Sequence, residues 1–167
     1  KASELMKLAQ AYGREVSDFV RSRPQFEPFQ VQFRGPHERT EKEDKVIAPF
    51  IDQLEELSRN YVELEQLLDQ PLNRRYPPEY AIDGISLDVA AESVAVQERN
   101  RLGLGDGPIG ILRDILEQDV GLRIFYLPLP APFSEIYFYN ETLGGCIAIN
   151  SQHPEERNRW SLTHAFG

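Results

Sequence analysis

Residues 155–167 read EERNRWSLTHAFG, a pattern that predicts a helix ending in His164-Ala165-Phe166-Gly167. Glu in place of Ala165, with a second His directly after Gly167, would complete the motif H-E-x-x-H. In that motif two His, four residues apart on one helix face, bind one zinc ion, and the Glu acts as base on the zinc-bound water. Taken alone, a single His is more often a structural residue than a metal ligand. The interpretation of His164 therefore depends on the residues that lead up to it.

Further pieces of a pattern precede the predicted helix in a definite order and spacing. They are Arg99 to Pro108 (RNRLGLGDGP), the apolar stretch Leu122 to Leu127 followed by Pro128-Leu129-Pro130, the apolar stretch Cys146 to Asn150, and Arg157 to His164. From about Ser86 to Gly167 the chain resembles the ImmA/IrrE family of bacterial zinc metallopeptidases. Members are often fused to, or encoded beside, an XRE-type helix-turn-helix DNA-binding domain.

The resemblance implies a zinc-dependent endopeptidase that cleaves a helix-turn-helix transcriptional repressor in a stress, mobile-element or phage-related response. His164 would be a zinc ligand, and Ala165 stands where the family has its general-base Glu. We therefore expect this chain to be catalytically inactive, whether the Ala is engineered or natural. The family's second His and acidic third ligand would both follow Gly167. A zinc peptidase needs three protein ligands, so we expect zinc in a longer parent protein and little on this chain alone.

Composition limits the other classes of function. The chain has 167 residues, is 41% hydrophobic and 27% charged, and is long enough for one or two domains. No apolar run approaches a membrane span and no signal peptide is visible, so we expect a cytoplasmic location. The single cysteine, Cys146, excludes an internal disulfide and a Cys-based zinc site, and its apolar stretch predicts a small core residue. A net charge of −9 disfavours binding to a phosphate backbone.

The N-terminal region predicts two short helices. Residues 3–20 (SELMKLAQAYGREVSDFV) resemble the last two helices of an XRE-type domain, although any amphipathic helix pair would fit nearly as well. On this interpretation residues 1–23 are a remnant of that domain, and DNA would be bound through a missing upstream part. Residues 24–40, in which apolar and polar residues alternate around Val31, form a linker or a short strand.

Glu41 to Gln70 is the clearest predicted helix, and with the connector to residue 85 it forms a separate segment. Pro49 either starts the helix proper or kinks it. Two apolar series recur every seven residues, namely Ile47, Leu54, Tyr61, Leu68 and Phe50, Leu57, Leu64. This seam predicts packing within the chain or, as an alternative, a homodimer. We interpret Asp52, Glu55, Glu56, Glu63 and Glu65 as an acidic, solvated face.

The second half predicts a helix, a helix, three strands and a final helix. The two helices are Ser86 to Leu102, with Val89, Ala90, Val94 and Ala95 inward, and Ile109 to Val120, before Gly121. The strands are Leu122 to Leu127, Glu135 to Tyr139 and Cys146 to Ile149, the last two forming a hairpin. The fold class is thus α+β, with a helical N-terminal half and a small sheet packed on a zincin-like active-site helix in residues 86–167. Asn150 is interpreted as a turn residue, His153 as a loop residue, and Arg157 and Arg159 as balancing the acidic surface.

Three functions remain open on these observations. The first is the inactive metallopeptidase with a helix-turn-helix repressor as its substrate. The second is a non-enzymatic DNA-binding transcriptional regulator that uses a peptidase-like domain for sensing or dimerisation. The third is a protein-interaction domain built on the long heptad helix. A His directly after Gly167 and an acidic residue some tens of positions later would favour the first.

Overall fold

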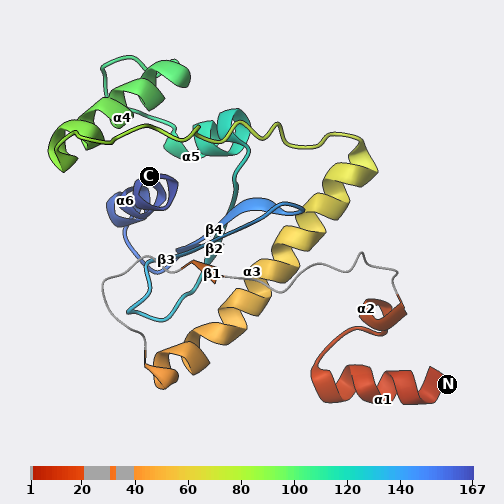
Figure 1. Cartoon of the computed structure of the whole chain (residues 1–167). Helices are drawn as coiled ribbons and strands as arrows, with labels where there is room; N and C mark the ends of the chain where they lie inside the picture. Colours follow the sequence, from red (N-terminus) through yellow and green to blue (C-terminus); the bar gives the residue numbers. More distant parts are fainter. Residues whose placement is uncertain (1, 21–30, 33–39) are drawn as a thin grey trace.

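The computed structural model describes residues 2–20, 31–32 and 40–167. Within them, helices and one mixed sheet form an α+β fold, as predicted (Figure 1). The helices are α1 (Ala2–Tyr12), α2 (Val16–Val20), α3 (Glu41–Leu68), α4 (Leu87–Arg101), α5 (Leu112–Ile115), the π-helical turn η1 (Leu116–Val120) and α6 (Glu155–Phe166). The strands are β1 (Val31–Gln32), β2 (Arg123–Leu127), β3 (Glu135–Asn140) and β4 (Gly144–Asn150). In these ranges no helix has the length and apolar character that a membrane crossing requires.

β4 lies inside the sheet, whose strand order is β1-β3-β4-β2. β3 and β4 are antiparallel and are joined by a turn at residues 141–143, which confirms the predicted hairpin. β2 runs parallel to β4, from Arg123 opposite Cys146 to Leu127 opposite Asn150. Every residue of β4 is buried, because helices cover both faces of the sheet.

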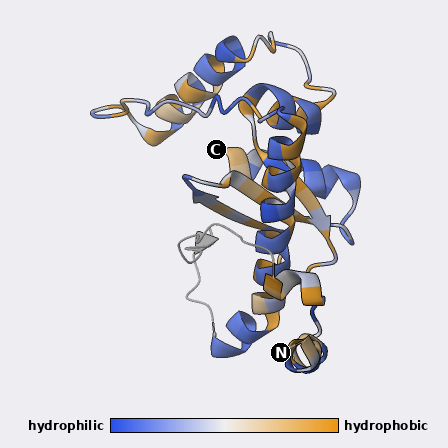
Figure 2. Ribbon diagram, turned by 90° about the vertical axis from the view of Figure 1, so that its right-hand side faces the viewer, coloured by the Kyte–Doolittle hydropathy of each residue, from blue (hydrophilic) through white to orange (hydrophobic). Residues whose placement is uncertain are grey.

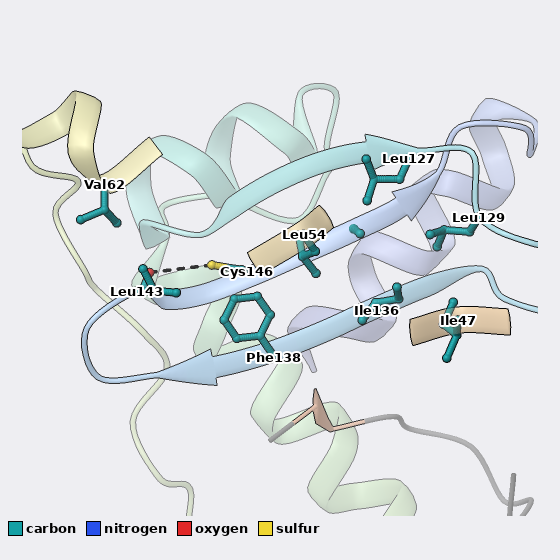
Figure 3. Close-up of a cluster of buried hydrophobic side chains, with 10 residues drawn as sticks. Ile47, Leu54, Val62, Leu127, Leu129, Ile136, Phe138, Leu143 and Cys146 are labelled. Carbon is teal, nitrogen blue, oxygen red and sulfur yellow. Dashed lines mark hydrogen bonds between the residues drawn. The ribbon is translucent and has the colours of Figure 1, made fainter. Parts of the chain in front are cut away.

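Alternate residues of β4 enter two separate cores. Cys146 and Ala148 lie in a cluster between the sheet and α3, which contributes Leu54 (Figure 3). Ile147 and Ile149 lie in a second cluster on the other face, formed with α5, η1 and α6. The period of two along a strand therefore assigns each side chain to one layer or the other. The resulting packing of α6 on a small sheet agrees with the sequence prediction.

The predicted N-terminal helix pair is present as α1 and α2. Gly13 ends α1 with a φ of 61°, a left-handed conformation that glycine adopts without a Cβ clash. Arg14 forms an ion pair with Glu56, which attaches the helix pair to α3. That this pair is the remnant of a helix-turn-helix domain stays a prediction.

Much of the predicted linker or strand at residues 24–40 lies outside the described residues. Within it, the backbone of Val31 and Gln32 pairs antiparallel with Phe138 and Tyr137 of β3. The short-strand alternative is therefore confirmed at these two positions.

α3 begins at Glu41, eight residues before Pro49. Thr40 caps it in a reciprocal arrangement, in which the Thr40 hydroxyl accepts from the Glu43 backbone N–H and the Glu43 carboxylate accepts from the Thr40 backbone N–H. Pro49 lies inside the helix, so the prediction that it starts the helix proper is wrong. The capping pair sets the start instead.

The heptad seam is buried over only part of its length. Ile47 and Leu54 are 1% and 0% exposed, whereas Tyr61, Leu64 and Leu68 are 36%, 53% and 61% exposed. The buried residues of α3 are Ile47, Leu54, Ser58, Val62 and Glu65. This stripe has the period of about 3.6 residues of an ordinary helix, which drifts about 20° per heptad from a strict seam. The prediction of a continuous seven-residue seam is therefore wrong in its second half.

The acidic residues of α3 do not form one solvated face. Asp52 is exposed, but Glu65 is 8% exposed and faces the sheet. Both of its carboxylate oxygens accept from the guanidinium of Arg123, at 2.6 and 2.7 Å from Nη2, and Oε1 also accepts from Nε at 3.0 Å. Arg123 is itself 1% exposed, donates to the Leu143 carbonyl, and lies 5.5 Å from the centre of the Tyr61 ring. A charge as deeply buried as Arg123 requires such partners, so the solvated interpretation fails at Glu65.

Two predicted helices of the second half differ in detail from the structure. α4 matches its predicted range and buries Ala90, but Val89 and Val96 are 60% and 51% exposed. Hydrophobic and hydrophilic positions alternate along the ribbon of this helix (Figure 2). The helix predicted from Ile109 starts only at Leu112, and its second half is the wider η1 turn. Gly121 follows with a φ of 84°, as a helix-ending glycine should.

Leu54 and Leu68 provide a test of the stripe, because they occupy the same heptad position and differ in burial. We expect Leu54→Ala to lower the free energy of unfolding by about 2–5 kcal/mol through lost burial and a cavity. Leu68→Ala should change it by less than about 0.5 kcal/mol. Denaturant unfolding measures both. Equal losses would show that the heptad seam continues to Leu68, in the chain or in a dimer.

Because Glu65 neutralises the buried Arg123, removing its carboxylate should lower the free energy of unfolding far more than removing an exposed carboxylate from the same helix. Glu65→Ala leaves the buried Arg123 cation without its carboxylate, and we expect a loss of about 3–5 kcal/mol in unfolding free energy. Asp52→Ala, a matched change at an exposed carboxylate of the same helix, should cost less than about 0.5 kcal/mol. Thermal and denaturant unfolding at neutral pH compare the two. A Glu65→Ala protein as stable as the Asp52→Ala protein would contradict the buried pairing.

Candidate functional site

α6 begins directly after Pro154 and lies across the sheet, with Asn158, Ser161 and Leu162 buried. Leu162 packs into the core cluster that contains Ile147 and Ile149 of β4. This buried face fixes the rotation of the helix about its axis. His164 consequently lies at the flank of α6, and Ala165 lies one position further round, on the side of the sheet.

The ring of His164 is held by a carboxylate from the sheet. Its Nδ1 lies 2.6 Å from Oε1 of Glu135, the first residue of β3. The Glu135 side chain is 16% exposed and that of His164 is 49% exposed. The sequence prediction placed a role on His164 but missed Glu135. A single Glu at a strand start has no local pattern, and only the packing of α6 against β3 brings the two together.

Ala165 lines a cavity of about 310 Å³ on the other side of the helix end. The lining residues are Tyr76, Pro77, Val120, Leu122, Tyr137, Tyr139, Ala165 and Phe166. The rings of Tyr76 and Tyr139 meet edge to face with their centres 5.8 Å apart. The cavity is thus largely apolar and aromatic, with tyrosine hydroxyls as its polar groups, a composition typical of ligand and side-chain pockets.

The connector after α3, residues 69–86, brings Tyr76 to the cavity. The Tyr76 hydroxyl accepts from the Gly145 backbone N–H at 2.9 Å, and the Arg75 N–H donates to the Val120 carbonyl at 2.9 Å. Gly121 lets the connector pass, because a Cβ there would lie 2.5 Å from the Asn73 carbonyl oxygen. Burial raises the pKa of the Tyr76 phenol, so this hydroxyl stays protonated at neutral pH.

The loop between β4 and α6 is built on Asn150, which is fully buried. Its side-chain N–H groups donate to the carbonyls of Leu129 and Phe133, at 3.0 and 2.8 Å, and its oxygen accepts from the Gln152 N–H. The interpretation of Asn150 as a turn residue is therefore confirmed. His153 is a loop residue, as predicted, and its carbonyl accepts from the Asn158 side chain.

Arg157 and Arg159 join α6 to its neighbours. Arg157 donates to the hydroxyl of Ser134, at 2.9 Å, and Arg159 donates to the carbonyl of Gly110, at 3.0 Å. These bonds connect the helix to the residue before β3 and to the loop before α5. The two arginines therefore position α6, in addition to any balance of surface charge.

The fit of this site to zinc is partial. In the described ranges, no three His, Cys, Asp or Glu side chains come close enough together to hold a metal ion. His164 can supply one ligand, and a carboxylate on Nδ1 is the usual second partner of a zinc-bound histidine. Among the described residues, the predicted zinc site is therefore reduced to one candidate ligand, His164.

The lone thiol does not offer an alternative nucleophile. Cys146 is fully buried in the core under α3, as predicted from its apolar stretch. Burial raises its pKa to about 11. The reactive species of a cysteine is the thiolate, so this residue is inert at neutral pH.

Searches against models of protein families, curated proteins and solved structures found no match for this chain. The resemblance to the ImmA/IrrE family therefore stays a prediction, drawn from the order of the sequence motifs in residues 86–167.

The burial of Cys146 predicts slow labelling by a thiol reagent. With a pKa of about 11, roughly one thiol in a thousand is ionised at pH 8, against about a quarter in an unfolded chain with a pKa near 8.5. We expect labelling in native buffer to be at least about 100-fold slower than in denaturant, because it requires ionisation and local opening. With a disulfide reagent that releases a chromophore when it reacts with a thiol, absorbance gives the labelling rates in native buffer and in denaturant. Comparable rates would show that β4 is open to solvent.

Proposed function

We propose that this chain is a catalytically inactive form of an ImmA/IrrE-type zinc endopeptidase whose substrate is a helix-turn-helix repressor. The observation that carries the proposal is the position of the α6 end. His164 lies with its Nδ1 against Glu135, while the next residue, Ala165, lines an aromatic cavity. The motif order leading to this helix supports the same conclusion.

Positions 164 and 165 would have different roles in the proposed site. His164 would hold the metal through Nε2, the ring nitrogen opposite its Glu135 contact. Zinc, where bound with its further ligands, supplies Lewis-acid polarisation and lowers the pKa of a bound water. Position 165 would carry the base that takes a proton from that water, and Ala has no group for this. The cavity beside it has room for the longer Glu side chain and for an apolar side chain of the substrate.

The parent protein would bind DNA through an upstream XRE-type domain and act in the bacterial cytoplasm. Support for an interface on the N-terminal helix pair comes from its exposed apolar side chains, with Met6, Tyr12 and Val20 61%, 71% and 65% exposed. Leu64 and Leu67 at the end of α3 are likewise exposed, at 53% and 76%, and would support a homodimer.

One observation favours the regulator as a second candidate. With Ala at position 165, the cavity carries no carboxylate among its lining residues, and three tyrosines surround it. Such a pocket suits a small aromatic or apolar effector. On this alternative the peptidase-like fold would sense a ligand, and Ala165 would be the functional residue.

Restoring a carboxylate at position 165 separates the two candidates. In a protein that extends beyond Gly167 and is loaded with zinc, Ala165→Glu should cleave the partner repressor about 10²- to 10⁴-fold faster than the Ala165 form, the usual contribution of a general base. A chelator should abolish the gain. Cleavage is followed on a gel with the repressor in excess.

Thr163→Glu is the matched control, because it adds the same charge at an exposed position of α6. It should leave cleavage at the level of the Ala165 form. Repressors that stay intact with zinc-loaded Ala165→Glu protein would favour the regulator. Equal rates with Ala and Glu at position 165 would show that the chemistry lies elsewhere.

A further inference from the structure

The contact between Glu135 and His164 joins two elements, β3 and α6, that both pack against β4. Glu135 lies opposite Ile149 of β4 in the sheet register, and Ile149 is fully buried. His164 lies on α6, which the buried Leu162 attaches to the same strand. The carboxylate and the ring are therefore placed by a common rigid support, and the 2.6 Å contact does not depend on a loop.

The two arginines of α6 have other partners. Arg157 of α6 donates to Ser134, the residue before Glu135, and Arg159 donates to the Gly110 carbonyl. His164 is the group that the structure places on the Glu135 carboxylate, whose side chain is 16% exposed. A carboxylate oxygen can only accept a hydrogen bond when ionised. The Nδ1 of His164 must then carry the proton, and in the neutral ring Nε2 carries a free lone pair.

We infer that Glu135 is a positioning residue that fixes His164 in the Nδ1–H tautomer and directs its Nε2 lone pair away from the sheet. The inference rests on the proposed function, since it names the residue that prepares His164 to bind a metal. A neutral imidazole in water prefers the opposite tautomer, with the proton on Nε2. Without Glu135 the ring would therefore present an N–H where a metal ligand needs a lone pair.

Nitrogen NMR of the ring tests this inference on the chain itself. The protein is labelled with ¹⁵N-histidine, and the resonances of His164 are assigned among the three histidines by their loss in His164→Gln. Spectra are recorded at a pH above which they no longer change, so that the ring is neutral. We expect a protonated Nδ1 and an unprotonated Nε2 in the unmodified chain.

Glu135→Ala should move the Nε2 resonance to the position of a protonated nitrogen and invert the tautomer preference. Glu141→Ala, at an exposed carboxylate in the turn of the same hairpin, should leave the tautomer unchanged. Melting temperatures measured in parallel separate loss of fold from loss of positioning, and the spectrum of the unmodified chain is a test that needs no variant. A protonated Nε2 in the unmodified chain, or the same tautomer in a folded Glu135→Ala protein, would overturn the inference.

The readout uses neither zinc nor cleavage, so it fails or succeeds separately from the proposed function. The expected tautomer together with an inert Ala165→Glu protein would leave Glu135 as a positioning residue and reject the peptidase. Cleavage by Ala165→Glu together with a protonated Nε2 in the unmodified chain would keep the peptidase and reject the role of Glu135.

Discussion

Arg123 is a long cationic side chain that is almost wholly removed from water, and the arrangement of the sheet and α3 depends on its neutralisation. Its guanidinium donates hydrogen bonds to both carboxylate oxygens of Glu65 on α3 and to the carbonyl of Leu143 in the β3–β4 turn. It also lies beside the Tyr61 ring. One side chain at the start of β2 thus joins three elements that are far apart in sequence. A buried ion pair contributes modest net stability, but a wrong alignment would leave a buried charge unpaired, at a cost of several kcal/mol. The pair therefore selects the register of α3 on the sheet, while the apolar residues supply most of the energy.

The same constraint extends to the candidate site through β4. α3 and Arg123 hold one face of the sheet, so the other face is free to bind α5, η1 and α6. The connector then crosses back from α3 and reaches the cavity, where Tyr76 bonds to Gly145 next to the same hairpin turn. Gly144 is needed for this passage, because a Cβ there would collide with the Tyr76 hydroxyl and approach the Arg123 guanidinium. The aromatic cavity and the ion pair consequently share one hairpin, to which Tyr76 bonds at Gly145 and Arg123 bonds at Leu143. A displacement of this hairpin would therefore change both.

Local signals in the sequence were sufficient for the helices, the strands, the hairpin and the helix-ending glycines, because caps, turns and periodicity act over a few residues. They failed where partners are distant. The heptad pattern of α3 overstated the seam, since Tyr61 and Leu68 are apolar but rotate off the buried stripe. The sequence did not distinguish Glu65 from the exposed acidic residues of α3, because its partner Arg123 lies 58 positions away. Glu135 and the cavity gave no pattern at all, since both arise only when the connector, β3 and α6 meet.

The geometry of the α6 end explains why the identity of the side chain at position 165 need not affect the fold. Successive residues of a helix are separated by about 100°, so His164 and Ala165 face different surroundings. Ala165 lines the cavity and also packs, partly buried, against the core cluster that α6 enters through Leu162. A larger side chain at this position can extend into the cavity. Asn150, Arg157 and Arg159, which support α6, bond to Leu129, Ser134 and Gly110 respectively. A change of side chain at position 165 is therefore expected to leave the packing of α6 on the sheet in place.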